Sequence, residues 1–145
     1  MLVKIFSICV MALTVLAMPV SSMADNDMII IRQIEKTPEV FAKEVEDYAK
    51  KREWNFLGSH KVKKGEITLV KFCVAEVGKQ LWKQGLQMSA LAPCGNIGVY
   101  QKDGKTEISV LNPRYMNILA PSAEMEKLSA AAEKDVMEML DVLAK

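Results

Sequence analysis

The sequence has almost no net charge, a formal +1, and only one histidine, and both features limit the functions that it can have. The 145 residues carry 19 Lys and Arg against 18 Asp and Glu. A nucleic-acid binder needs a net positive footprint, so this balance argues against DNA or RNA as a partner. The same balance gives no reason to propose an anionic membrane surface as a partner. The partner is therefore expected to be a small ligand or another protein.

The sequence also lacks a hydrophobic run long enough for a stable membrane anchor. Residues 5–18 are uncharged and largely apolar, but this stretch spans only 14 residues, and about 20 are needed to cross the hydrocarbon core. Lys4 precedes the run, and the small residues Ser22 and Ala24 follow it, as at a signal peptidase site. The alternative is an uncleaved anchor. We expect residues 1–24 to be a signal peptide and the mature protein, residues 25–145, to be one periplasmic or otherwise extracytoplasmic domain.

Cysteine motifs are missing as well. Of the three cysteines, Cys9 lies in the leader, which leaves Cys73 and Cys94 in the mature chain. They form no CxxC or CxxCH motif, so covalent haem attachment is not indicated. The segment 95–98 has two glycines but lacks the lysine of a phosphate loop. No cofactor is expected, and the missing catalytic constellation makes a non-enzymatic protein the first hypothesis.

Apolar residues are plentiful, and their spacing indicates an α+β fold. Alternating or apolar runs predict strands over residues 28–34, 55–62, 67–74, 97–101 and 106–111. The first strand is almost continuously apolar, so we expect it to be buried on both faces. The Asp103-Gly104 dipeptide predicts a hairpin turn. This order predicts an antiparallel sheet with helices on one face.

Helices are predicted around three segments. Thr37-Pro38 is a typical helix start, and basic residues at 50–52 suit its end. Residues 76–84 predict a short helix, and Pro121-Ser122 precedes a long final one. Apolar residues in the final helix step by three or four, which predicts a core-facing stripe formed by Met125, Leu128, Ala132, Val136, Met139 and Leu143.

The stretch from Phe72 to Leu143 resembles the family known as domain of unknown function 302. The matching features, in order, are Cys73, Pro93-Cys94, Val99-Tyr100, the Asp-Gly turn, Asn112-Pro113 and the final amphipathic helix. Where the family often has Asn-Pro after the first cysteine, this chain has Val74-Ala75. The resemblance implies a β-α-β(4)-α architecture similar to the TATA-box-binding-protein fold, often as a homodimer. It implies no activity and no DNA binding.

The two mature cysteines are the strongest candidate for a site. Cys73 ends one predicted strand and Cys94 precedes the next, places that lie close together in an antiparallel meander. We expect their Cα atoms within about 7 Å and a structural disulfide between them. The alternatives are two separate buried thiols, a redox couple, or a copper or zinc site completed by His60 or Met88.

Other polar residues extend this candidate site. Asn112 and Arg114 flank Pro113 at a strand exit and could form a polar clamp, although such residues are also routine in turns. Together with His60, Met88 and Asn96 they form the predicted pocket. The first hypothesis is therefore an exported binding domain, and the second is thiol-redox or soft-metal handling through Cys73 and Cys94.

Overall fold

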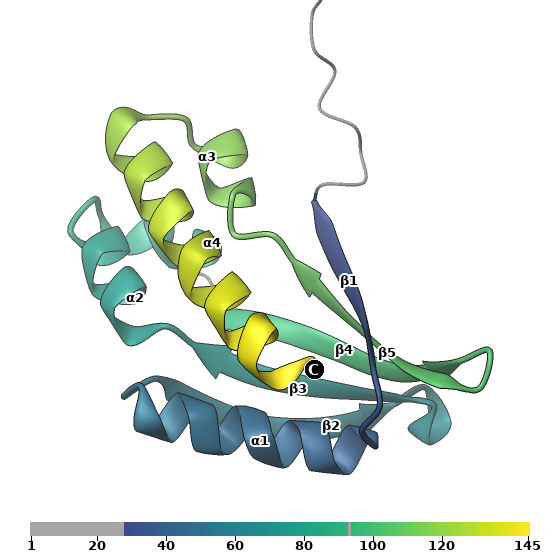
Figure 1. Ribbon diagram of the computed structural model, residues 1–145. Helices are drawn as coiled ribbons and strands as arrows, with labels where there is room; N and C mark the ends of the chain where they lie inside the picture. The colour runs from purple at the N-terminus through teal and green to yellow at the C-terminus, as the bar shows by residue number, and fades with distance from the viewer. Residues whose placement is uncertain (1–27, 93) are drawn as a thin grey trace, which may run out of the picture.

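The structure, a computed structural model that describes residues 28–92 and 94–145, is a five-stranded antiparallel sheet with its two long helices on one face (Figure 1). The strand order is β1-β5-β4-β3-β2. The strands are β1 (Ile29–Ile34), β2 (Asn55–Val62), β3 (Ile67–Cys73), β4 (Cys94–Lys102) and β5 (Lys105–Leu111). The predicted fold class is thereby confirmed, and the strands and long helices follow one another along the chain in the predicted order. The predicted signal peptide lies outside the described residues.

The helices begin where the sequence indicates. In α1 (Pro38–Lys51), the Thr37 hydroxyl accepts a hydrogen bond from the backbone N–H of Val40 at 3.3 Å. In α4 (Ala123–Leu143), the Ser122 hydroxyl accepts one from Met125 at 3.0 Å. These side chains satisfy N–H groups that lack a partner within the helix. The short helix α2 (Ala75–Trp82) lies between β3 and β4.

Two short helical elements were not predicted. The 3-10 segment η3 (Leu86–Leu91) follows α2, and α3 (Tyr115–Leu119) follows β5. Neither is long enough to show a helical repeat of apolar residues, the signal on which sequence reasoning depends. A third short element, the three-residue 3-10 segment η2 (Lys63–Gly65), connects β2 to β3, and its middle residue Lys64 has a left-handed backbone with φ of 56°.

The core lies between the sheet and the helices. The rings of Trp54 and Phe72 stack with their centroids 5.6 Å apart, and Tyr48 meets Trp54 edge-on at 5.5 Å. Arg52 lies over this cluster and forms ion pairs with Asp135 and Glu138 of α4. The aromatic cluster therefore joins α1, the sheet and α4 into one packed unit.

The first strand is a correction to the sequence prediction. β1 is an edge strand that pairs with β5 alone. Ile29 and Ile31 are 46% and 55% exposed, whereas Ile34 is buried. The expectation of burial on both faces was therefore wrong, because the helices cover only one face of the sheet and alternate residues of β1 point to the other.

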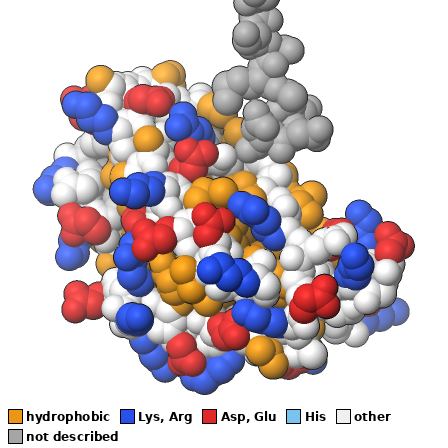
Figure 2. All heavy atoms as spheres, in the orientation of Figure 1, with side chains coloured by type: hydrophobic (Ala, Val, Ile, Leu, Met, Phe, Trp, Pro, Cys, Tyr) orange, Lys and Arg blue, Asp and Glu red, His pale blue; other side chains and the backbone are white. Residues whose placement is uncertain are grey.

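Charges of both signs are mixed over the helix-side face. Figure 2 shows basic and acidic side chains interspersed there, around hydrophobic side chains near the middle of the view. On α1, Lys43 pairs with Asp47 at 2.9 Å and Lys50 pairs with Glu46 at 2.5 Å. Exposed pairs of this kind add little to the stability of a helix, because water screens their attraction. Within the described residues, no helix is both long and apolar enough to cross a membrane.

Candidate functional site at the disulfide

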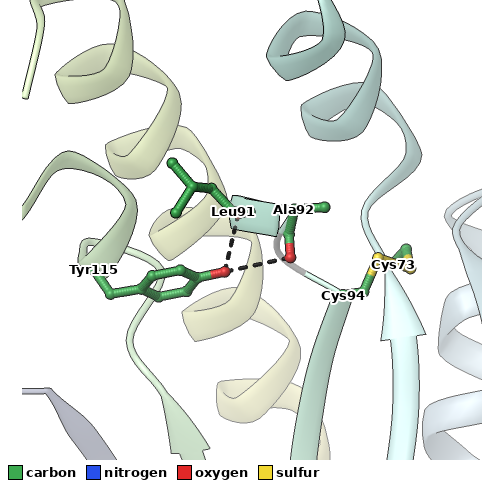
Figure 3. The surroundings of a disulfide bond; sticks show 5 residues. All are labelled: Cys73, Leu91, Ala92, Cys94 and Tyr115. Carbon is green, nitrogen blue, oxygen red and sulfur yellow. Dashed lines mark hydrogen bonds between the residues drawn. A yellow bond between two sulfur atoms is a disulfide. The ribbon is translucent and has the colours of Figure 1, made fainter. Parts of the chain in front are cut away.

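Cys73 and Cys94 are directly opposite each other at one end of the sheet. They form the last pair of the β3–β4 ladder, their Cα atoms are 4.0 Å apart, and their sulfurs are bonded (Figure 3). The predicted proximity and disulfide are both found in the structure. The two cysteines meet because Cys73 ends β3 and Cys94 begins β4, and antiparallel pairing places these two ends side by side.

The chain between the two cysteines leaves the sheet and returns to it. It forms α2 and η3, and α2 packs against α4. The returning end is anchored by Tyr115, whose hydroxyl oxygen lies 3.0 Å from the carbonyl oxygen of Leu91 and 3.3 Å from that of Ala92 (Figure 3). Burial raises the pKa of the Tyr115 hydroxyl, so it remains a hydrogen-bond donor at neutral pH.

A small hollow opens beside the disulfide. Its volume is about 180 Å³. Its lining is mostly apolar and consists of Asn55, Cys73, Val74, Ala75, Gly78, Lys79, Trp82, Ala92 and Cys94. Trp82 is 48% exposed, an unusual state for so large an apolar side chain. The disulfide thus forms a covalently fixed part of the lining, called the floor of the hollow below, and the Trp82 ring forms one wall.

Gly78 shapes the wall that Trp82 provides. It lies four residues before Trp82 on α2, and a Cβ added there would meet the Trp82 ring at 3.5 Å. The ring therefore lies directly over the glycine, on the same side of the helix. An added Cβ would make an ordinary van der Waals contact with the indole, whereas a side chain that extends beyond Cβ would have to displace it and change the hollow.

His60 lies apart from the disulfide. It pairs with Leu69, four residues before Cys73 on β3, which corresponds to roughly 13 Å along the strand. There it lines a separate groove of about 410 Å³ between α1 and β2. The charged side chains Glu39, Lys43, Glu46 and Lys61 border that groove. The structure therefore does not bring His60 to the sulfurs.

Met88 does not line the hollow either. Met88, in η3, is half-buried and packs against the core. Asn96 is placed by its backbone in β4, opposite Lys71. In the described part of the chain, no group of three or more His, Cys, Asp and Glu side chains is arranged to hold a metal ion.

Asn112 and Arg114 form the predicted polar clamp, but both side chains bind Glu133 of α4 and not a ligand pocket. Asn112 donates to one carboxylate oxygen of Glu133 at 2.9 Å, and the Arg114 Nε donates to the other at 2.5 Å. The Arg114 backbone N–H also donates to the Asn112 side chain at 2.9 Å. Desolvation raises the pKa of Glu133, but the hydrogen bonds from Arg114 and Asn112 outweigh it and lower the pKa overall.

The sequence reasoning missed the residues that give the site its shape. The predicted site residues did not include Gly78, Lys79, Trp82 or Tyr115. A glycine four residues before a tryptophan on a short helix was the available signal, because residues i and i+4 share one face. The path of residues 74–92 over the end of the sheet could not be deduced from that spacing.

Comparison with known proteins agrees with this architecture. The family model described as "Domain of unknown function DUF302" matches residues 30–143. No curated protein is significantly similar to the chain in sequence. A crystal structure of an uncharacterized conserved protein DUF302 from Bacillus stearothermophilus superposes with a TM-score of 0.70 at 15% identity. The match covers 80% of this chain and 98% of that one, and at this identity it shows a shared fold. The chain therefore belongs to the DUF302 family of domains of unknown function.

Proposed function

We propose that this domain is a non-enzymatic binding module that accepts one apolar side chain of a protein partner in the hollow beside the disulfide. The observation that carries this proposal is the apolar hollow of about 180 Å³ with half-exposed Trp82 as its wall. Pockets for drug-sized ligands measure roughly 300–1,000 Å³, so this hollow suits a single ring or branched side chain.

The composition of the hollow supports binding by burial of apolar surface. Tryptophan is enriched among the residues that dominate binding energy at protein interfaces. Asn55 and Lys79 are the polar and charged members of the lining. They lie among apolar neighbours, where they would orient a partner's backbone. The disulfide keeps the floor in place before the partner arrives, which lowers the entropy cost of binding.

We also propose that the protein acts outside the cytoplasm after cleavage behind Ala24. The leader pattern in residues 1–24 motivates this location. A disulfide between Cys73 and Cys94 supports it, because disulfides persist in oxidising compartments. The homodimer that the family resemblance implies stays a prediction.

The binding proposal can be tested with a probe that mimics a phenylalanine side chain. Benzyl alcohol is titrated into the isotopically labelled mature protein, and chemical shifts are followed by NMR. We expect changes centred on the Trp82 indole and on the amides of Gly78 and Ala92. The blocked peptide Gly-Phe-Gly should bind the same place more tightly, because its backbone can reach the polar lining residues.

A matched pair of variants identifies the residue responsible. Trp82→Ala should weaken binding of the peptide by about tenfold or more, as truncation of an aromatic anchor does. Leu86→Ala is the control, because Leu86 is 80% exposed and does not line the hollow. Equal effects of the two variants, or shifts spread over the open face of the sheet, would contradict the proposal.

A further inference from the structure

The two cysteines of the disulfide differ in their exposure to solvent. Cys94 is an exposed residue, whereas Cys73, at the end of β3, is half-buried. An attacking thiolate must approach one sulfur along the S–S bond and expel the other, so access decides which sulfur is attacked. We therefore expect a thiol in solution to reach Cys94 more easily than Cys73.

The two sulfurs also differ in their electrostatic surroundings. Cys73 lies two residues before the start of α2, and the N-cap residue Val74 provides no side-chain hydrogen bond to the helix. The N–H groups of the first turn carry partial positive charge and stabilise a nearby anion. Lys79 lines the same hollow, and Lys71 lies on the same face of β3, two residues before Cys73. Lys79 lies beside both cysteines, so the feature that favours a thiolate at position 73 over one at position 94 is the start of α2, which directly follows Cys73 in the chain.

One acidic group works against this stabilisation. Glu76 lies in the first turn of α2, but its carboxylate accepts a hydrogen bond from Gln80 at 2.8 Å and pairs with Lys79 at 3.5 Å. Glu76 is exposed and is not part of the hollow's lining. Glu76 and Lys79 therefore largely offset each other, and the N–H groups of the first turn of α2 together with Lys71 remain to favour Cys73 as the leaving group.

From these two asymmetries we infer that the Cys73–Cys94 bond is a reducible thiol–disulfide site with a fixed polarity, in which Cys94 receives the attack and Cys73 leaves. A thiolate of a dithiol donor attacks the Cys94 sulfur and forms a mixed disulfide. The S–S bond electrons pass to Cys73, which leaves as a thiolate. The donor's second thiolate then attacks its own sulfur in the mixed disulfide and releases Cys94 as a thiolate.

The overall reaction is a two-electron exchange. The donor dithiol becomes a disulfide, the protein disulfide becomes two thiols, and the two protons lost by the donor thiols balance those taken up by the cysteines. The fold can survive this step, because the β3–β4 ladder contains six further residue pairs, from Ile67–Tyr100 to Phe72–Gly95. Tyr115 also holds the returning chain at Leu91. Reduction therefore breaks the bond between the two cysteines that line the hollow, while β3 and β4 remain paired.

The polarity can be measured on the unmodified mature protein. The oxidised protein is incubated with reduced glutathione, quenched with acid, and digested for mass spectrometry. We expect glutathione on Cys94 in at least about tenfold excess over Cys73, because the leaving group and the access both favour that product. Glutathione on Cys73, or equally on both cysteines, would overturn the assignment.

A second measurement tests whether the bond is reducible in the folded state. The native protein is equilibrated in glutathione redox buffers and its thiols are counted, with far-UV circular dichroism recorded in parallel. We expect conversion to two thiols while the dichroism signal is retained. A disulfide that resists reduction until the protein unfolds would be an inert staple, and the inference would be wrong.

Single-cysteine variants separate the two electrostatic environments. The pH dependence of alkylation of Cys73 in Cys94→Ser should have its midpoint below the ordinary thiol value of about 8.5. Lys79→Gln in that background should raise the midpoint. Lys83→Gln is the matched control, since Lys83 follows α2 but does not line the hollow. A midpoint for Cys94 in Cys73→Ser that is lower than that for Cys73 would contradict the inferred polarity. This result is independent of whether an apolar side chain binds beside Trp82.

Discussion

At the scale of residues, we expect the disulfide between Cys73 and Cys94 to stabilise the folded protein. Their bond spans a sequence separation of 21 residues and constrains the unfolded chain. Replacing both with Ala should lower the free energy of unfolding by about 3 kcal/mol on the chain-entropy model. Urea unfolding of the double variant and of the chemically reduced wild type should give similar losses. A loss below about 0.5 kcal/mol, typical of a surface change, would mean that the bond adds nothing to stability.

Glu133 is a single residue whose charge supports the fold in a defined range of pH. Its pKa is lowered in the folded protein, so its stabilising contribution is present above the ordinary value of 4.5 and is lost as pH falls through the folded pKa. Glu133→Gln should therefore reduce stability at pH 7 and flatten the decline in melting temperature below about pH 5. Because the Asn112 and Arg114 side chains would lose charged acceptors, the cost at pH 7 should be about 1–3 kcal/mol.

The natural comparison for that variant is another glutamate on the same helix. Glu138→Gln changes an exposed partner of Arg52, which keeps Asp135 as a second partner. We expect its effect to be within about 1 kcal/mol, as for other surface ion pairs. Identical pH profiles for wild type and Glu133→Gln, measured by thermal unfolding, would show that the clamp does not depend on the Glu133 charge.

At the scale of elements, the stripe along α4 divides into a buried part and a half-buried position. Met139 is fully buried, whereas Leu128 is half-buried beside the groove between α2 and α4. Met139→Ala should cost about 2–5 kcal/mol, because it removes core contacts and leaves a cavity. Leu128→Ala should cost less, about 1 kcal/mol, since its site is partly open to solvent. Chemical denaturation of both variants gives the comparison, and equal losses would place Leu128 in the core after all.

Element boundaries show how local signals and pairing combine. The Thr37 and Ser122 caps are set by neighbouring residues, so the starts of α1 and α4 could be predicted from sequence. At the hairpin, Asp103 and Gly104 both have positive φ, 50° and 78°, as the Asp-Gly signal predicts. The prediction began β4 at residue 97, whereas the strand begins at Cys94 because residues 94–96 pair with β3. Pairing with a strand that is more than 20 residues away in the sequence gives no local sequence signal, so the start of β4 could not be predicted.

At the scale of the whole molecule, the proposed export can be tested directly. The expected mature N-terminus is Asp25, because Ser22 and Ala24 supply the small residues that signal peptidase requires. N-terminal sequencing or intact mass measurement of protein from the soluble extracytoplasmic fraction checks this. Recovery of the intact leader in the membrane fraction would instead show that residues 1–24 anchor the protein. A variant with Ala24→Arg should accumulate uncleaved if the site is correct.

The sequence by itself determined the fold class and the closeness of the two mature cysteines. Alternation and helical spacing reflect which side chains must leave water, and two cysteines at the ends of consecutive antiparallel strands are brought together by the ladder. These properties depend on local pattern and on the connection of neighbours along the chain. They could therefore be read without coordinates.

Only the tertiary structure decided which surfaces remain open and which polar residues meet. The run of isoleucines in β1 looks buried until the strand is seen at an edge with one face uncovered. Asn112 and Arg114 look like a pocket clamp until α4 brings Glu133 to them. His60 is carried away from the sulfurs by strand register, and Trp82 is brought beside them by the path of α2. Such placements depend on how distant elements pack, and packing is decided by the whole chain at once.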